Sequence, residues 1–563
     1  MDTIAYILLA IVIAILVKVY NHRKNIKDLR IALNKQFGKK PKTQRYDFED
    51  LSHYWNEYKK NLPDDEMIDE ITWNDLEMDK LFYRINNCSS FPGEQVLYSM
   101  LHCLPKDKLY TESLEERIKF FLNSDSERLE MQLLLLTSLG KDRDSYFVPN
   151  FISDIDTFEI KGIWKYRVMQ GLLFLFIILA VIFQSQGFLL LSSMVFIINI
   201  IVYSKQKFKY ESYLKALGDI AAIISFGKKV ANSKVLSYES KFNELNERVG
   251  AFKKLSYNII NVTSKKNAVT SGDLFAILYD YIMGATLIDF IRYDQIMRVL
   301  KNKEKEFMDL YKRIGMIDMA ITIGSFRRSL PHYCTPLFNK DKILQIQDIY
   351  HPLIDDPVVN TATLDGNCII TGSNASGKST FIKAVAVNVI LAQSLNTCMA
   401  KKMVLPFSRV ITSMAVTDDL MSGESYYIKE IKYLNRIIKS LSDERFVICV
   451  IDEILRGTNT EERIAASASI LKYIHKKNCL AIVATHDIEL TSILGSLYKN
   501  YHFREQMHEK DITFDYRIYD GVSKSRNAIK LLKYVGFPHE IINEAEGFDV
   551  NLLHENRNVP SGG

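Results

Sequence analysis

The residues best suited to chemistry in this chain form a glycine-rich loop, residues 372–380, which fits the phosphate-loop pattern G-x-x-x-x-G-K-[ST]. The glycines let the backbone wrap around phosphates, and the following helix start supplies N–H donors and a positive dipole. Lys378 would reach the β- and γ-phosphates of a nucleotide, and the Ser379 hydroxyl would ligate Mg²⁺. The alternative interpretation is a glycine turn followed by a helix cap.

A second candidate group is the acidic pair Asp452 and Glu453, which follows the unbroken apolar run 446–451. Such a run is typical of a strand buried on both faces of a parallel sheet. An acid at the carboxyl end of this strand lies beside the phosphate loop. Asp452 would hold the Mg²⁺ shell, directly or through water, and Glu453 would orient or deprotonate the attacking water. The alternative is a pair of acids that caps the next helix.

The elements that must position these groups are also legible. An apolar run, residues 368–370, precedes the loop, and a helix-patterned stretch, residues 381–392, follows it. A further apolar run, residues 480–485, ends in His486, which could sense the γ-phosphate there. A lone histidine at a strand end is more often a polar group that only makes local hydrogen bonds. His486 is a candidate because the two other predicted strands also end in groups suited to a nucleotide site. Together these runs predict an α/β domain with a mainly parallel sheet.

In their order along the chain, these motifs resemble the ATPase core of the MutS-type family. The resemblance covers roughly residues 344–546 and rests on six blocks, residues 351–352, 371–380, 418–430, 452–460, 484–486 and 520–525. A weaker likeness to the helical core of the same family covers residues 71–105 and 113–122.

The resemblance implies an ATPase that uses ATP and Mg²⁺ and works as a homodimer. It implies catalytic roles for Glu453 and His486 and a metal site at Ser379 and Asp452. The nucleotide-binding residues it implies are Gly372, Asn374, Gly377, Lys378, Ser379, Thr380 and Ser425. Ser425 belongs to the segment that, in this family, approaches the nucleotide of the partner subunit, where its hydroxyl would meet the γ-phosphate. The alternative for this segment is a plain helix start.

The chain also departs from the family. It begins with a hydrophobic segment, the core-like helices start near residue 46, and no stretch resembles the mismatch wedge. The resemblance therefore implies an ATPase domain and a helical lever region, without mismatch recognition.

The first segment predicts a membrane anchor. Residues 4–17 form a continuous apolar run that residues 18–20 can extend at the interface. About 17 residues at 1.5 Å each span roughly 25 Å. A cleaved secretory signal is the alternative, but it needs a basic start and a small-residue cleavage site. Because only Asp2 carries a side-chain charge before the run, we expect an uncleaved anchor.

A second apolar region, residues 168–203, is interrupted by residues 184–187. Two membrane helices joined by a tight turn and a buried hairpin of a soluble core are both compatible with it. The near absence of charge favours the membrane hairpin, because soluble amphipathic helices carry a polar face.

Loop charges predict the orientation of these spans. Residues 21–45 carry nine lysines and arginines and one acid, and the turn at residues 184–187 carries no charge. Both hairpin flanks are basic, through Lys161, Lys165, Arg167, Lys205, Lys207 and Lys209. The positive-inside rule then predicts a multi-pass protein of the cell membrane whose ATPase domain is cytoplasmic.

Composition adds two limits. The net charge of +5 is mild, and much of the basic excess flanks the predicted spans, so it is poor evidence for nucleic-acid binding. Lysine clusters such as residues 228–229, 253–254, 265–266 and 301–305 leave DNA contact open. The seven cysteines are scattered without a C-x-x-C pair, which suits a reducing compartment and argues against a zinc site.

The predicted fold class is a multidomain α and α/β protein, in which a helical core and lever region with transmembrane helices accompanies a P-loop ATPase domain. The expected order begins with a transmembrane anchor (residues 1–20), a basic juxtamembrane segment (21–45) and a helical core-like domain (46–163). A transmembrane hairpin (164–205) and a helical lever region (206–335) follow. The ATPase domain (336–548) and a tail without fixed structure (549–563) complete the chain.

The predicted function is a membrane-anchored MutS-like ATPase, with in-line attack of water on the γ-phosphate. Its predicted partners are a second copy of the chain and membrane lipid, with DNA and a further protein left open. The main alternative is an ATP-switched protein that tethers DNA or a protein partner at the membrane and hydrolyses slowly. A transport ATPase is a third reading, but three short spans leave little material for a translocation path.

Overall fold

The structure is a computed structural model of the chain. It describes residues 2–42, 45–231, 247–252, 282, 284–373, 376–414, 426–441, 444–456, 458–508, 511–522, 532 and 535–547. These residues fall into two compact units. The first comprises residues 1–64, 82–103 and 107–329, and the second comprises residues 65–81, 104–106 and 330–563.

The first unit is helical, as the sequence predicts for the amino-terminal half. Its elements are α1 (Asp2–Gln36), α2 (Phe48–Tyr58), η1 (Lys59–Asn61), α5 (Phe91–Leu101), α6 (Lys108–Asn123), α7 (Asp125–Ser138), η3 (Arg143–Phe147), α8 (Val148–Ser153), η4 (Ile155–Phe158), α9 (Ile163–Phe183), α10 (Gln186–Ala231), α14 (Ile288–Leu300) and α15 (Glu304–Arg328). Helix α1 is one continuous helix, so the predicted anchor and most of the basic segment after it belong to a single element.

The core of this unit forms where α15 crosses the start of α5. The carboxylate of Asp318 is fully buried and accepts hydrogen bonds from the backbone N–H groups of Ser89 and Ser90 and from the Ser90 hydroxyl, at 2.6 to 3.0 Å. A side chain at Gly93 would collide with this carboxylate, since an added Cβ would lie 2.2 Å from its oxygen. The buried acid therefore holds the turn that enters α5, whose N-cap is Ser90, and fixes the approach of this turn to α15.

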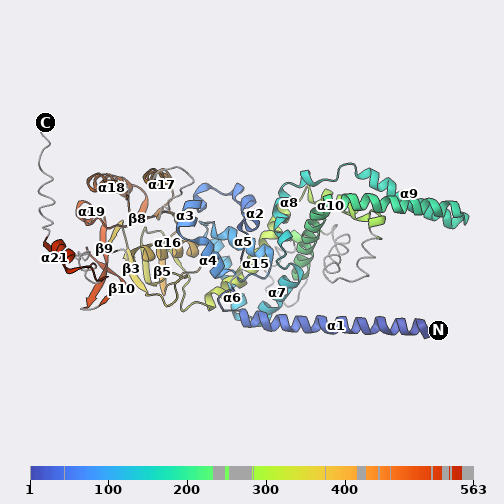
Figure 1. Ribbon diagram of the computed structural model, residues 1–563, viewed down its shortest axis with the longest axis horizontal. Coiled ribbons are helices and arrows are strands. Elements are labelled where there is room, and N and C mark those ends of the chain that lie inside the picture. The colour runs from blue at the N-terminus through green and yellow to red at the C-terminus, as the bar shows by residue number, and fades with distance from the viewer. Residues whose placement is uncertain are drawn as a thin grey trace. The chain divides into compact units, whose positions relative to one another are not determined.

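Helices α9 and α10 form the predicted hairpin, and Gln184 turns the chain with a positive φ of 46°. Among the described residues, two helical segments, Ile155–Phe183 and Gln186–Gln206, are long and apolar enough to cross a membrane, and only 17% of the apolar window of each is buried. The second helix is longer than the apolar run predicts, because α10 continues to Ala231. Figure 1 shows the two helices side by side.

Polar side chains anchor a later segment to this hairpin. The Gln170 amide on α9 donates to the carbonyl of Thr286 at 3.0 Å, and the buried Asn199 amide on α10 donates to the carbonyl of Ala285 at 2.8 Å. Tyr203 donates its hydroxyl to Asp289 at 3.2 Å. The chain that enters α14 is therefore held against both hairpin helices.

The second unit contains two sheets. In the larger sheet, β4 (Cys368–Thr371), β6 (Arg409–Ser413), β7 (Val447–Asp452), β8 (Cys479–Ala484), β9 (Lys499–His508) and β10 (Asp511–Asp520) lie in the order β10-β9-β4-β8-β7-β6. All its neighbours pair in parallel except β9 and β10. A smaller sheet of mixed direction has the order β1-β5-β2-β3, with β1 (Leu337–Asn339), β2 (Leu344–Ile349), β3 (Asn360–Leu364) and β5 (Lys402–Pro406).

Helices cover the larger sheet. The apolar side chains of α17 (Tyr426–Ser440), α18 (Thr460–His475) and α19 (Ile488–Ile493) join those of β7 and β8 in one core cluster. Figure 1 shows the three helices in the same part of the chain as these strands. Helix α16 (Lys378–Leu395) is buried along nearly its whole length. The predicted parallel α/β arrangement is confirmed for this sheet, and α21 (His539–Gly547) follows it in the chain.

A short segment from the amino-terminal half also belongs to this second unit. It contains the last two residues of η2 (Asp64–Glu66), all of α3 (Glu70–Asp75) and the start of α4 (Met78–Ile85). Asp75 accepts hydrogen bonds from the Thr412 hydroxyl at 2.7 Å and the Met414 N–H at 3.0 Å, while Glu77 pairs with Lys383 at 3.2 Å. These contacts join residues that are more than 300 positions apart in the sequence.

Candidate functional site

The backbone of the predicted phosphate loop has the conformation that its glycines allow. Gly372 has φ 142° and Gly377 has φ 103°. An added Cβ at Gly372 would lie 2.7 Å from the Phe503 carbonyl oxygen, so position 372 excludes any side chain. The loop follows β4 and leads into α16, as the sequence predicts. Asn374 lies outside the described residues.

Lys378 is the first residue of α16 and is almost fully buried. Its ammonium group donates to the carbonyl oxygens of Gly372 and Ser373, at 2.5 and 2.9 Å. The positive charge is therefore held inside the loop, where a phosphate would add a negative partner. Ser379 and Thr380 follow it in the first turn of the helix, where backbone N–H groups have no partner within the helix.

The predicted histidine and glutamate meet each other and the loop. His486 Nε2 lies 2.7 Å from Glu453 Oε1, and its Nδ1 lies 3.1 Å from the carbonyl oxygen of Gly372. Both neighbours are hydrogen-bond acceptors, and the imidazole lies between them within hydrogen-bond distance of each. The sequence predicts His486 and Glu453 at the ends of two different strands. The structure brings both side chains together beside the glycine loop.

Glu453 is held in an uncommon conformation. Its φ is 63°, and its N–H donates to the Ala484 carbonyl at 2.9 Å. Its second carboxylate oxygen pairs with the Arg456 guanidinium. Burial opposes ionisation, but the hydrogen bond from His486 and the positive charges of His486, Arg456 and Lys378 outweigh it and lower the pKa of Glu453. These contacts therefore keep the carboxylate ionised and hold it in one orientation.

Asp452 and Ser379 supply oxygen donors of the kind that Mg²⁺ prefers. Asp452 ends β7, which is separated from β4 by β8, and within the described part of the chain no side chain pairs with its carboxylate. The described residues also contain no group of three or more His, Cys, Asp or Glu side chains that could hold a metal by themselves. The two residues fit a metal that shares its shell with phosphate and water, as nucleotide-bound Mg²⁺ does.

A pocket of about 240 Å³ opens beside the loop. It is lined by Ile349, Tyr350, His351, Ile354, Asp356, Pro357, Val358, Asn360, Gly377, Thr380, Phe381, Ala384 and Tyr516. Burial lowers the pKa of His351 to about 4, so this ring is neutral at physiological pH. A mostly apolar pocket at the end of a phosphate loop fits a nucleotide base.

Tyr516 lines this pocket although its sequence context does not predict it there. It has a φ of 53° in an irregular stretch of the β9–β10 pairing between Phe514 and Ile518. Asn360 holds this stretch, since its amide donates to the Tyr516 carbonyl at 3.0 Å and accepts from the Ile518 N–H at 2.8 Å. Tyr516 lines the pocket beside Gly377 and is 45% exposed. A bulge turns this side chain toward the pocket, and no sequence pattern marks it.

Glu430 and Arg456 also lie near this site. The N–H of Arg456 donates to the buried carboxylate of Glu430 at 3.1 Å. Glu430 is part of the block on which the family resemblance rests, so this contact gives it a position next to the loop after β7. Ser425 and the rest of residues 415–425, Gly457 and residues 523–531 lie outside the described residues, so the predicted role of Ser425 stays a prediction.

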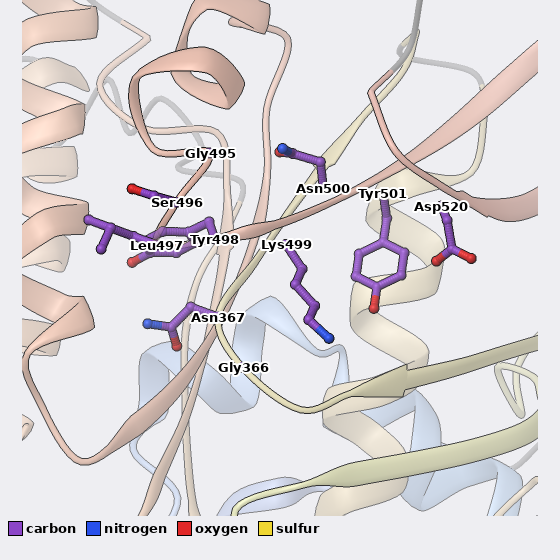
Figure 2. Close-up of a pocket in the computed structure, with 10 residues that line it drawn as sticks. All are labelled: Gly366, Asn367, Gly495, Ser496, Leu497, Tyr498, Lys499, Asn500, Tyr501 and Asp520. Carbon is purple, nitrogen blue, oxygen red and sulfur yellow. The ribbon is translucent and has the colours of Figure 1, made fainter.

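A second depression, of about 440 Å³, lies at the other end of the strands, where β4 and β9 begin (Figure 2). Lys499 pairs there with Asp365 at 2.6 Å. The Asn367 side chain accepts from the Ala481 N–H at 2.8 Å and contacts His475 at 3.1 Å. These polar groups already hold one another, and the phosphate loop lies at the other end of β4.

The second unit is therefore an α/β domain with a mainly parallel sheet. Its glycine loop after β4, the buried lysine and the acidic end of β7 have the features of a phosphate-binding site.

Sequence comparison agrees with this class. Residues 368–552 match the family described as MutS domain V, so this part of the chain is similar to that domain. The chain is 30% identical over 272 residues to the DNA mismatch repair protein MutS of Streptococcus thermophilus, and 31% identical over 274 residues to that of Streptococcus uberis. Each match covers 46% of this chain and 32% of the relative, so the chain matches about a third of each relative's length.

Proposed function

We propose that this protein binds ATP with Mg²⁺ and hydrolyses it, and that the energy of this cycle drives a conformational change. The observation that carries the proposal is the chain of contacts from Lys378 through the Gly372 carbonyl and His486 to Glu453. It joins the groups that would hold the phosphates to the group that would act on water. Phosphoryl transfer depends mainly on such positioning and electrostatics.

Each residue has a separate task in this mechanism. Lys378 and the loop N–H groups neutralise the β- and γ-phosphates. Ser379 and Asp452 hold the metal, which when bound neutralises the phosphate charge that develops during the reaction. Glu453 orients the attacking water and accepts its proton. His486, which touches both Glu453 and the loop, responds to the γ-phosphate. Tyr516 and His351 enclose the base.

Two variants test this division of tasks. Lys378→Ala is expected to abolish ATP binding, whereas Glu453→Gln is expected to retain binding and lose turnover. ATP affinity and steady-state hydrolysis are measured for both proteins. Normal turnover by the Glu453→Gln protein would overturn the assignment of the catalytic acid.

We further propose that two copies of the chain complete each other's sites through the segment around Ser425. The support is the match of residues 368–552 to MutS domain V and the position of Glu430, which follows this segment, beside Arg456. Mixing Lys378→Ala and Ser425→Ala subunits tests this idea. One working site should return in the mixed dimer, because one intact loop faces one intact Ser425. An isolated mixed dimer of the double mutant with wild type should then be inactive, because each of its sites keeps one damaged half.

A membrane location is also proposed, with the ATPase domain on the cytoplasmic side. The hairpin exposes large apolar side chains along both helices, and those more than half exposed are Trp164, Val168, Ile178, Val181, Ile182, Phe183, Leu189, Leu190, Met194, Ile197 and Ile201. Soluble proteins rarely expose so continuous an apolar surface. Trp164, which is 63% exposed, lies with Lys165 and Arg167 at the base of α9, as interfacial residues do.

A slow ATP-switched tether is the second candidate function. The relatives' name, DNA mismatch repair protein, favours DNA as what such a tether would hold. DNA binding by the detergent-purified protein that weakens as salt is raised would support this candidate, because phosphate contacts release counterions. A protein that hydrolyses ATP without binding DNA at low salt would favour the first proposal.

A further inference from the structure

Two cysteines that are 64 positions apart in the sequence lie directly opposite each other in the second unit. Cys334 and Cys398 form an isolated antiparallel bridge. The N–H of each donates to the carbonyl of the other, and both distances are 2.9 Å. Both side chains are thiols in the structure. Cys334 is partly exposed, and Cys398 is fully buried.

This pairing places the two residues within reach of a disulfide bond. Antiparallel residues that exchange both hydrogen bonds have Cα atoms about 5.5 Å apart, and disulfides join Cα atoms about 4.4 to 6.8 Å apart. Directly opposite side chains project from the same face, with Cβ atoms about 4.5 to 5.5 Å apart. A disulfide needs a slightly closer approach, about 3.5 to 4.5 Å between the Cβ atoms. The bond would therefore be strained and easily reduced.

We propose that Cys334 and Cys398 form a reversible disulfide when the protein meets a peroxide. The Cys334 thiolate attacks one peroxide oxygen, the O–O bond breaks, and Cys334 becomes a sulfenic acid with release of water. The Cys398 sulfur then attacks the Cys334 sulfur, the S–O bond breaks, and a second water leaves. The two thiols lose two electrons and two protons in total, and a dithiol reductant reverses the change.

The other cysteines are less suited to this chemistry. Cys88, Cys103, Cys368 and Cys449 are buried. Burial raises the pKa of Cys368 to about 12 and that of the partly exposed Cys479 to about 11, which disfavours the reactive thiolate. Of the described thiols, Cys334 alone combines partial exposure with a directly opposite cysteine.

The bond would act on the base pocket, a consequence that rests on the proposed ATP binding. Cys398 follows the end of α16, and the next residue, Met399, accepts the Tyr350 N–H at 3.0 Å. The Tyr350 hydroxyl donates to the His332 carbonyl at 2.7 Å, two residues before Cys334. Tyr350 lines the pocket. Drawing the two cysteines together would therefore pull on both supports of Tyr350 and weaken nucleotide binding.

The test uses the full chain in detergent, treated with hydrogen peroxide and then alkylated. Peptide mass spectrometry without reductant is expected to find a Cys334–Cys398 linked peptide that disappears with dithiothreitol. A fluorescent ATP analogue is expected to bind about fivefold or more weakly after oxidation, with recovery on reduction. Cys334→Ser should abolish the linked peptide and the affinity change, whereas Cys479→Ser, the matched control, should keep both.

Oxidation that leaves no Cys334–Cys398 peptide, or that links other cysteines instead, overturns the disulfide. A linked peptide with unchanged nucleotide affinity overturns the regulatory consequence. If the reduced protein binds no ATP analogue, the proposed function fails, and the linked peptide still decides the disulfide separately.

Discussion

Arg463 donates two hydrogen bonds to the carboxylate of Asp487, from Nε to Oδ2 at 3.0 Å and from Nη2 to Oδ1 at 2.6 Å. Arg463 lies in the first turn of α18, and Asp487 directly follows His486. Both side chains are largely shielded from solvent, at 23% and 14% exposed. Because a two-point contact with a planar guanidinium fixes orientation as well as distance, this pair fixes the backbone that carries His486.

We therefore predict that Arg463→Ala lowers the turnover number for ATP about ten- to a hundredfold while ATP affinity changes little. The reason is that His486 and Glu453 lose their fixed positions, whereas the phosphate loop is untouched. Steady-state kinetics and equilibrium binding are measured side by side. The double variant Arg463→Asp with Asp487→Arg should recover part of the rate.

Lys499→Ala is the matched control for this experiment, because it removes an ion pair with Asp365 at the end of the strands that lies away from the phosphate loop. Its rate should equal that of wild type. An Arg463→Ala protein with unchanged turnover would show that the pair has no positioning role.

Tyr516→Ala is predicted to weaken ATP binding about five- to a hundredfold, since stacking of an aromatic ring on a base contributes roughly 1–3 kcal/mol. Tyr516→Phe keeps the ring and should bind nearly as wild type. Tyr519→Ala is the matched control, because Tyr519 lies on the same strand and contacts His502 and Arg504. Equal affinity of the Tyr516→Ala and wild-type proteins would remove Tyr516 from the base site.

His102 gives the helical unit a predictable pH dependence. It is stacked on Trp55 and its Nδ1 lies 2.9 Å from the Tyr98 carbonyl. Burial lowers its pKa to about 3, so the ring is neutral in the folded chain. The unfolded chain, with an ordinary histidine pKa of about 6.5, binds the extra proton. The stabilisation from His102 is therefore full above pH 6.5 and is lost as the pH falls toward 3.

The expected loss is about 1.4 kcal/mol per pH unit below pH 6, from one proton. It is measured as the difference in unfolding free energy between wild type and His102→Gln at pH 7, 6 and 5. That difference should shrink as the pH falls. A difference that stays constant across this range would contradict a neutral buried His102.

The membrane proposal predicts that Ser185, in the hairpin turn, is extracytoplasmic and that Lys207 is cytoplasmic. Single cysteines are placed at these positions after the seven native cysteines are replaced. In intact cells an impermeant thiol reagent should label the Ser185→Cys protein and spare the Lys207→Cys protein, which should react only after lysis. The reverse pattern would mean an inverted topology, and labelling of neither position in intact cells would favour a buried soluble hairpin.

Local sequence determined the parts of the site that depend on neighbours along the chain. The glycines at 372 and 377 specify their own backbone conformations, and Lys378 and Ser379 follow at fixed positions on a helix start. The apolar runs before Asp452 and His486 determined two buried parallel strands. Since the carboxyl ends of parallel strands share one edge, their polar ends could be predicted to converge.

Tertiary structure alone decided the contacts that complete the site. Tyr516 reaches the pocket because Asn360, 156 positions earlier, holds an irregular turn of β10. Asp75 joins Thr412 across 337 positions, and Arg463 meets Asp487 only when α18 packs beside α19. No periodicity or spacing encodes such pairs, because their energy depends on which distant surfaces the packed sheets and helices bring together. The sequence thus determined the chemical groups, and packing decided which of them act on one another.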